Sequence, residues 1–86
     1  MNEILNKAIE VNGADYQMNV AIEELSELIK EICKKKCGLG NDLHLAEEMA
    51  DVEIILQELK LITGNADMVE VYKLRKMDRL AANLGY

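Results

Sequence analysis

Apolar residues recur every three or four positions along most of the chain, and this spacing predicts four amphipathic helices. The predicted helices span residues 2–11, 16–36, 43–62 and about 67–83. Leu, Ile, Ala, Glu and Lys dominate the composition, whereas Pro, Phe and Trp are absent, which favours helices over strands. We therefore predict an all-α fold, an antiparallel bundle of about four helices in a single domain of residues 1–86.

Turn-forming residues separate the predicted helices at three places: Asn12-Gly13, Gly38 with Gly40, and Thr63-Gly64-Asn65. The residues that follow these breaks are good N-caps. We expect Asp15 to cap the second helix and Asn41 or Asp42 to cap the third. Asp67 and Glu70 have the spacing of a capping box at the start of the fourth helix.

Each of the longer helices carries an apolar stripe. On the second helix it comprises Met18, Ala21, Ile22, Leu25, Leu28, Ile29 and Ile32, within a sector of roughly 120°. The stripe of the third comprises Leu45, Met49, Val52, Ile55, Leu56, Leu59 and Ile62, and that of the fourth Leu74, Met77, Leu80, Ala81 and Leu84. We expect these stripes, together with Cys33, to face a core. Four such helices expose more apolar surface than one bundle hides, so we expect dimerisation to complete the bundle, as a homodimer or a dimer of dimers.

The charge and the remaining composition exclude several classes of partner. The net charge of −6 does not attract a nucleic acid polymer. No apolar run reaches membrane-spanning length and no secretory signal pattern is visible, so we expect no membrane partner and a cytoplasmic protein. A zinc site built from Cys33, Cys37 and His44 would lack a fourth ligand.

Two acidic segments stand out on the second and third predicted helices. They are Glu23-Glu24-Leu25-Ser26-Glu27 and Glu47-Glu48-Met49-Ala50-Asp51. Each places carboxylates three or four residues apart, on one side of a helix. The intervening residues are enough to finish one helix, turn and return, so the two segments are expected to face each other. Converging carboxylates repel one another unless a cation lies between them.

The two segments are not equivalent on their helices. Glu48 falls inside the apolar sector of the third helix, and Asp51 lies at its edge. Glu24 lies just outside the stripe of the second helix, and Glu27 lies further round. A buried carboxylate needs a cation, a basic partner or a proton. Glu48 is therefore the residue with the strongest claim to a functional role.

A basic strip on the fourth helix suggests what such a site would act on. It comprises Tyr72, Arg75, Lys76, Arg79 and Asn83. Facing carboxylates suit a hard divalent cation such as Mg²⁺, which bridges to phosphate oxygens and activates water. Lys and Arg side chains hold phosphates. Together these features indicate chemistry on a nucleotide polyphosphate.

The segments 21–28 and 46–52, with their glutamates and Asp51, resemble the E-E-x-x-E … E-x-x-D signature of the MazG-like all-α nucleoside triphosphate pyrophosphohydrolases. The segment 72–80 is similar to the K-x-x-R-L segment near the end of small members. A glutamine at the position of Gln17, shortly before the first acidic segment, is also typical of this family. The resemblance covers nearly the whole chain. It implies a helical fold in which two subunits build the active sites. It also implies Mg²⁺-dependent hydrolysis of a (d)NTP to (d)NMP and pyrophosphate, a house-cleaning activity on nucleotide pools.

The resemblance also assigns roles to residues. It implies a metal site for Mg²⁺, with Mn²⁺ as a substitute, made by Glu24, Glu27, Glu48 and Asp51. Glu23 would complete the catalytic group, either as an outer ligand or as a water-orienting base. Lys76 and Arg79 would contact phosphates, and Gln17 and Tyr72 the rest of the substrate. Phosphoribosyl-ATP pyrophosphohydrolases share this fold, but their other motifs are not visible in the sequence.

Two alternatives need no catalysis. The chain would then be a helical module that binds a nucleotide or a protein partner, or a plain oligomerisation bundle with solvated acidic clusters. The short turn between the acidic helices leaves little loop for a base-specific pocket. The only aromatic residues are Tyr16, Tyr72 and Tyr86, so the base and the sugar of the substrate stay open.

Overall fold

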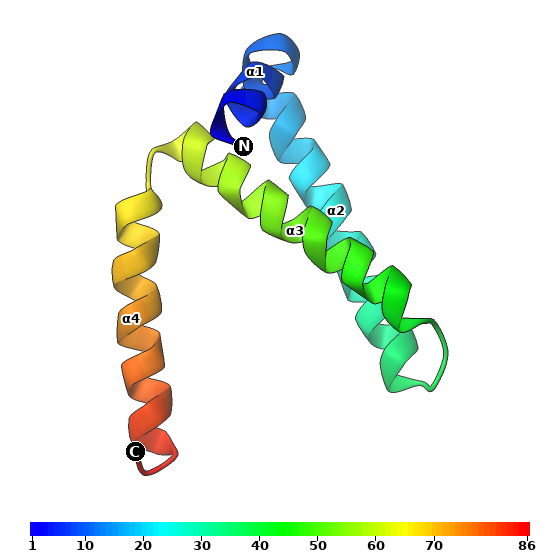
Figure 1. Ribbon diagram of the computed structural model, residues 1–86, viewed down its shortest axis with the longest axis vertical. Coiled ribbons are helices and arrows are strands. Elements are labelled where there is room, and N and C mark those ends of the chain that lie inside the picture. The colour runs from blue at the N-terminus through cyan, green and yellow to red at the C-terminus, as the bar shows by residue number, and fades with distance from the viewer.

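The computed structural model describes residues 1–86 as four helices joined by short turns (Figure 1). They are α1 (Asn2–Asn12), α2 (Ala14–Lys36), α3 (Asp42–Thr63) and α4 (Ala66–Asn83). The chain is 86% helical and has no strands, so the predicted all-α class is confirmed. None of the helices combines the length and the apolar character needed to cross a bilayer.

The predicted breaks between helices are confirmed, and glycines with positive φ lie at all three. Gly13 separates α1 from α2 with φ 91°, a backbone conformation that side chains with a Cβ rarely adopt. Gly64 ends α3 in the left-handed conformation typical of helix C-termini. Asn41 caps α3 as predicted, because its Oδ1 accepts hydrogen bonds from the backbone N–H groups of Leu43 and His44 at 2.8 and 3.1 Å.

The predicted caps of α2 and α4 are wrong. Both helices begin earlier than expected, α2 at Ala14 directly after Gly13 and α4 at Ala66. Asp15 and Asp67 therefore lie inside the first turn, where their charge suits the positive helix end but no side-chain cap forms. The physical reason is that the helices extend back to Gly13 and Asn65, which become the N-cap residues, and neither of them makes a side-chain capping hydrogen bond.

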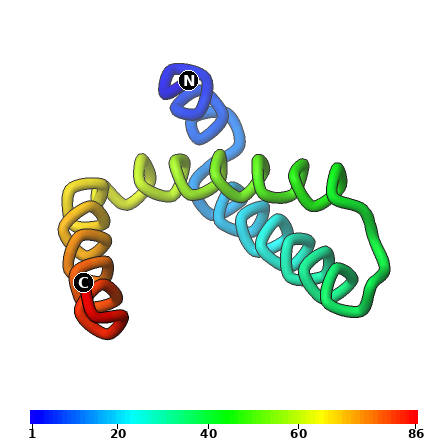
Figure 2. The backbone as a smooth tube through the Cα atoms, turned by 60° about the horizontal axis from the view of Figure 1, so that its bottom comes forward, coloured from blue at the N-terminus to red at the C-terminus, as the bar shows by residue number.

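The α2–α3 hairpin is the centre of the molecule, and α1 packs against both of its helices. Figures 1 and 2 show α4 projecting away from this unit as a separate arm. No residue of α4 is buried, and α4 makes no extensive contact with the other helices. The radius of gyration is 15.7 Å, whereas a compact domain of this length has about 12 Å. The single chain is thus an open shape rather than a closed bundle.

The core of the chain is small and partly polar. Its buried residues are Leu5, Ala21, Val52, Ile55, Gln17, Glu31 and Glu58. The polar ones have partners: Gln17 Nε2 donates to Glu58 Oε1, and Gln17 Oε1 accepts from Asn12 Nδ2 at 3.1 Å. Glu31 accepts from Lys34 Nζ at 3.4 Å. Hydrogen bonds of this kind are what allow polar side chains to be buried between helices.

The orientation of α2 corrects the expectation that its apolar stripe faces the core. Of that stripe only Ala21 is buried and Leu28 half-buried. The other five residues, Met18, Ile22, Leu25, Ile29 and Ile32, are exposed, and so is Cys33. The small side chain of Ala21 allows the helices to approach closely, and the side that packs on α3 is the one with Gln17, Glu24 and Glu31.

Candidate metal centre

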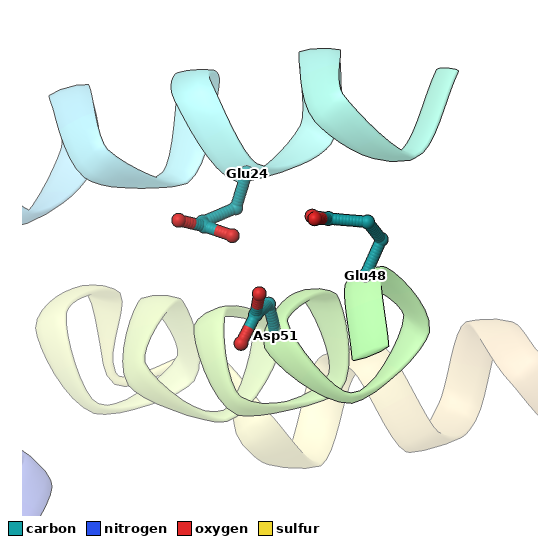
Figure 3. A group of neighbouring side chains, drawn as sticks. All are labelled: Glu24, Glu48 and Asp51. Carbon is teal, nitrogen blue, oxygen red and sulfur yellow. The ribbon is translucent and has the colours of Figure 1, made fainter. Parts of the chain in front are cut away.

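The α2–α3 contact brings three carboxylates together. One oxygen each of Glu24, Glu48 and Asp51 can be chosen so that all lie within 4.8 Å of one another. Figure 3 shows Glu24 pointing from α2 towards α3, and Glu48 and Asp51 pointing back from α3. The three residues that the sequence singles out most strongly therefore converge on one place between the helices.

The local structure explains this convergence. Glu48 and Asp51 are three residues apart on α3, so they lie side by side on one helical face. Glu24 is three residues beyond the buried Ala21, on the side of α2 that packs on α3. All three side chains come from the interior of long helices rather than from loops. Such positions hold ligand groups more precisely than loop positions do.

Glu48 is the least compensated polar group of the chain. The residue is half-buried, but its Oε2 is covered from solvent and has no hydrogen-bond partner. A covered carboxylate oxygen without a donor is unfavourable. The ion pairs of the chain join Lys7 to Glu10, Lys34 to Glu31, Lys35 to Asp42 and Lys73 to Glu70. None of them neutralises the three clustered carboxylates.

Two of these carboxyl groups have perturbed acidity. Burial, followed by repulsion from Asp51 and then Glu48 and Glu27, raises the pKa of Glu24 above its ordinary value. Burial also raises the pKa of Glu48, with further contributions from Asp51, Glu27, Glu31 and Glu47. The protein therefore supplies negative charge to this place and no positive charge. A bound divalent cation would reverse both shifts, because it favours the ionised form.

The structure places the other predicted acidic residues at the margin of this cluster. Glu27 is exposed and lies outside the three-residue group, although its charge reaches both Glu24 and Glu48. Glu23 is exposed on α2, and its carbonyl accepts a hydrogen bond from the Ser26 hydroxyl at 2.7 Å. Their roles as a fourth ligand and as a base stay predictions.

Glu31 is a residue that the sequence reasoning missed. It is buried, and its charge is one cause of the raised pKa of Glu48. The available signal was its spacing, since Glu31 is seven residues after Glu24 and so lies on the same face of α2. Its contact with Lys34 offsets part of its charge, so we regard Glu31 as an outer neighbour of the cluster.

The predicted substrate-contacting residues lie elsewhere in the single chain. Gln17 is buried, with both ends of its amide engaged by Glu58 and Asn12. Tyr72 is exposed on α4 beneath Arg75, whose guanidinium carbon is 5.8 Å from the ring centroid. Lys76 and Arg79 are also exposed on α4, which does not pack on the acidic helices. One chain therefore does not bring the basic strip and the carboxylates together.

Comparison with known proteins does not assign this site, because no family model, no curated protein and no solved structure matches the chain. The resemblance to MazG-like enzymes therefore rests on the quoted acidic and basic segments alone. The physical argument rests on three converging carboxylates, one covered oxygen without a donor and the lack of a basic partner. Oxygen-rich, negatively charged sites of this kind suit Mg²⁺ or Mn²⁺ rather than softer metals.

Proposed function

We propose that the protein is a Mg²⁺-dependent nucleoside triphosphate pyrophosphohydrolase that converts a (d)NTP into (d)NMP and pyrophosphate in a cytoplasmic nucleotide pool. The observation that carries the proposal is the covered Glu48 Oε2, which lacks any donor from the protein and belongs to a carboxylate that converges with those of Glu24 and Asp51. A divalent cation would satisfy this oxygen and relieve the repulsion among the three carboxylates. The acidic and basic segments of the MazG-like signature then specify which phosphate chemistry the cation would serve.

The carboxylates divide into holding and proton-accepting groups. Glu24, Glu48 and Asp51 would hold the cation, with Mn²⁺ as a substitute for Mg²⁺. When bound, Mg²⁺ supplies positive charge to the phosphate oxygens and lowers the pKa of a nearby water. A water attacking the α-phosphorus would break the bond from this phosphorus to the oxygen bridging to the β-phosphate, and pyrophosphate would leave. Glu27 would add a fourth ligand from the exposed margin, and Glu23 would serve as an outer ligand or accept the proton of the attacking water.

Phosphate recognition requires a second copy of the chain in this proposal. Lys76 and Arg79 are exposed on α4, which makes no extensive contact with α2 or α3 of its own chain. If they contact the triphosphate held at the carboxylates, they come from a neighbouring copy, as expected for a homodimer or a dimer of dimers. Tyr72 would accompany them. Gln17 would contact the substrate only if its hydrogen bonds to Glu58 and Asn12 were exchanged.

The decisive experiment measures pyrophosphate release from a panel of canonical and modified (d)NTPs with and without Mg²⁺. We expect metal-dependent turnover by the wild type and its loss in Glu48→Gln, which removes a charge without changing the size of the side chain. Glu10→Gln is the matched control, because Glu10 is an exposed glutamate on α1 far along the chain from both acidic segments. If the wild type shows no turnover above Glu48→Gln on any nucleotide, the catalytic proposal fails.

One observation favours a second candidate, a module that binds a nucleotide or a partner without turnover. The basic strip and the carboxylates lie on parts of the chain that do not pack together. A protein of this kind would bind Mg²⁺ and nucleotide but release no pyrophosphate. Titration calorimetry beside the turnover assay separates the two candidates, because binding without hydrolysis supports the module.

A further inference from the structure

A hollow of about 370 Å³ lies where α3 and α4 meet. Figure 1 shows α4 leaving α3 there at an open angle. The volume is near the lower end of the range for small-molecule sites, roughly 300–1,000 Å³. Residues from both helices and from the turn between them line the hollow: Leu56, Leu59, Lys60, Asn65, Val69 and Lys73. None of these residues belongs to the three clustered carboxylates or to the basic strip, so the hollow is separate from the candidate metal centre.

The apolar part of the lining is entirely aliphatic. Leu56, Leu59 and Val69 supply it, and no aromatic residue is among the lining residues. Leu56 is exposed, and Leu59 and Val69 are half-buried, so each keeps apolar surface that the single chain leaves uncovered. The hollow offers no ring on which a nucleobase could stack, whereas an alkyl chain gains free energy from any apolar wall that it covers. The lining therefore suits an alkyl group.

Both charged residues that line the hollow are cationic, although the whole chain has a net charge of −6. Lys60 is half-buried and takes part in none of the ion pairs of the chain. Lys73 pairs with Glu70 at 3.4 Å, but both side chains are more than half exposed, so the pair is weak and open to exchange. Asp67, in the first turn of α4, does not line the hollow. Two ammonium groups beside an aliphatic wall favour a ligand with an anionic head.

We propose that this hollow binds a medium-length alkyl anion, a molecule such as octanoate in which an aliphatic chain carries one carboxylate or phosphate head. The alkyl chain lies against Leu56, Leu59 and Val69. The head accepts hydrogen bonds from the ammonium groups of Lys60 and Lys73. This match of an apolar wall and two cations to an apolar chain and an anion is what selects the occupant.

Such a ligand also acts on the position of α4. This helix makes no extensive contact with the other helices, and the hollow is lined from both sides of the turn. A ligand that touches Leu56 and Val69 at once binds best at one angle between α3 and α4, so it favours that angle over others. The proposal does not rest on the proposed function, because no residue of the acidic cluster takes part.

The test titrates the full chain with hexanoate, octanoate, octyl phosphate and octanol, and follows the backbone amide signals by NMR. We expect saturable shifts that centre on the lining residues, and an affinity that rises about fourfold for each further methylene that is buried. Octanol should bind at least about tenfold more weakly than octanoate, because it has no charge for the two ammonium groups. Tighter binding of octanoate or of octyl phosphate decides which head the site takes.

Matched variants separate the hollow from general surface binding. Lys60→Gln should weaken octanoate binding by at least about tenfold, because it removes a charged donor. Lys30→Gln is its control, since Lys30 is exposed on α2, forms no ion pair and does not line the hollow. Val69→Trp should abolish binding by filling the hollow at unchanged charge. Val71→Trp, on the other side of α4, should leave binding unchanged.

The Trp variants should keep the helical circular dichroism of the wild type, because no residue of α4 is buried in the single chain. Glu48→Gln should bind octanoate as the wild type does, so a failure of the proposed catalysis and a failure of this site are separate results. The proposal is overturned if the wild type shows no saturable binding of octanoate or octyl phosphate. It is also overturned if the shifts centre elsewhere, or if Lys60→Gln and Val69→Trp keep the wild-type affinity.

Discussion

The two sides of α2 are reversed relative to an ordinary amphipathic helix. The side against α3 carries Gln17, Glu24 and Glu31, whereas the free side carries Ile22 and Ile29. Helices normally place their apolar stripe against their own core. The reversal leaves polar side chains on the inner side of the hairpin, where α2 packs on α3, and apolar side chains on its outer, exposed side. The apolar side of α2 is therefore left uncovered by the single chain.

The largest expected effect comes from removing the charge of Glu48, on the side of the hairpin where α2 packs on α3. We expect Glu48→Gln to lower metal-dependent turnover by about 100-fold or more, because a direct ligand should matter at least as much as the partners that orient ligands. The kinetic constants should be measured at saturating Mg²⁺ and again at a tenfold higher concentration. Recovery of full turnover at the higher concentration would mean that Glu48 contributes metal affinity only.

A second test asks whether the carboxylates bind a cation at all. We expect Mg²⁺ to stabilise the wild type by about 2.7 kcal/mol at 100 times its dissociation constant. For a domain of this size, that corresponds to a rise in Tm of roughly 10 °C or more. The measurement is thermal unfolding at fixed protein concentration with Mg²⁺ or Na⁺ at equal ionic strength. An identical rise in Glu48→Ala would place the Mg²⁺ effect away from the cluster.

The neighbouring residues Ala21 and Ile22 lie on different sides of α2 and test how differently the two sides are packed. Ala21 is 4% exposed between α2 and α3, whereas Ile22 is 66% exposed. Ala21→Leu should destabilise the fold by about 1–3 kcal/mol, because the larger side chain overfills a close helix contact. Ala14→Leu, at a half-buried position of the first turn, should have a smaller effect. Denaturant midpoints measure both. Equal tolerance at the two positions would contradict the orientation of α2.

The smallest expected effect is a dependence of stability on pH. The pKa values of Glu24 and Glu48 are raised above the ordinary 4.5, so the folded chain holds protons that the unfolded chain has released. Their contribution to stability is complete below pH 4.5 and is lost as the pH rises through the raised values. In metal-free buffer, Tm should therefore fall by a few degrees as the pH rises above this range. Glu48→Gln should show a shallower slope, and an unchanged slope would exclude Glu48 as its source.

The fold class and most helix ends could be predicted because they depend on local chemistry. Gly13, Asn41 and Gly64 act on their own neighbouring backbone, so the sequence alone marks them. Glu48 could be found for a related reason, since a carboxylate inside an apolar stripe is visible on one helix. The caps predicted at Asp15 and Asp67 are wrong because cap positions change when a helix begins one or two residues earlier.

The orientation of α2 and the position of α4 could not be predicted, because each depends on two helices at once. The α2–α3 contact is set by the small Ala21 and by the pairing of Gln17 with Glu58, forty-one residues further along the chain. The helical pattern of the sequence identifies the apolar stripe of α2, but it does not say whether α3 or another element covers that stripe. Lys76 and Arg79 could be recognised as a basic strip, but no periodicity states that their arm is detached from the acidic helices.

The detached arm has a consequence for how this protein responds to its own concentration. An isolated helix of 18 residues, such as α4 in a dilute solution, has little stability beyond its own backbone hydrogen bonds. Its amide hydrogens should then exchange with solvent far sooner than those of α2 and α3. In the oligomer that the proposed function requires, ordering of α4 would be coupled to association, so helical content should increase with concentration. The residues that carry the basic strip would thus be presented in helical form mainly when enough chains are present to assemble.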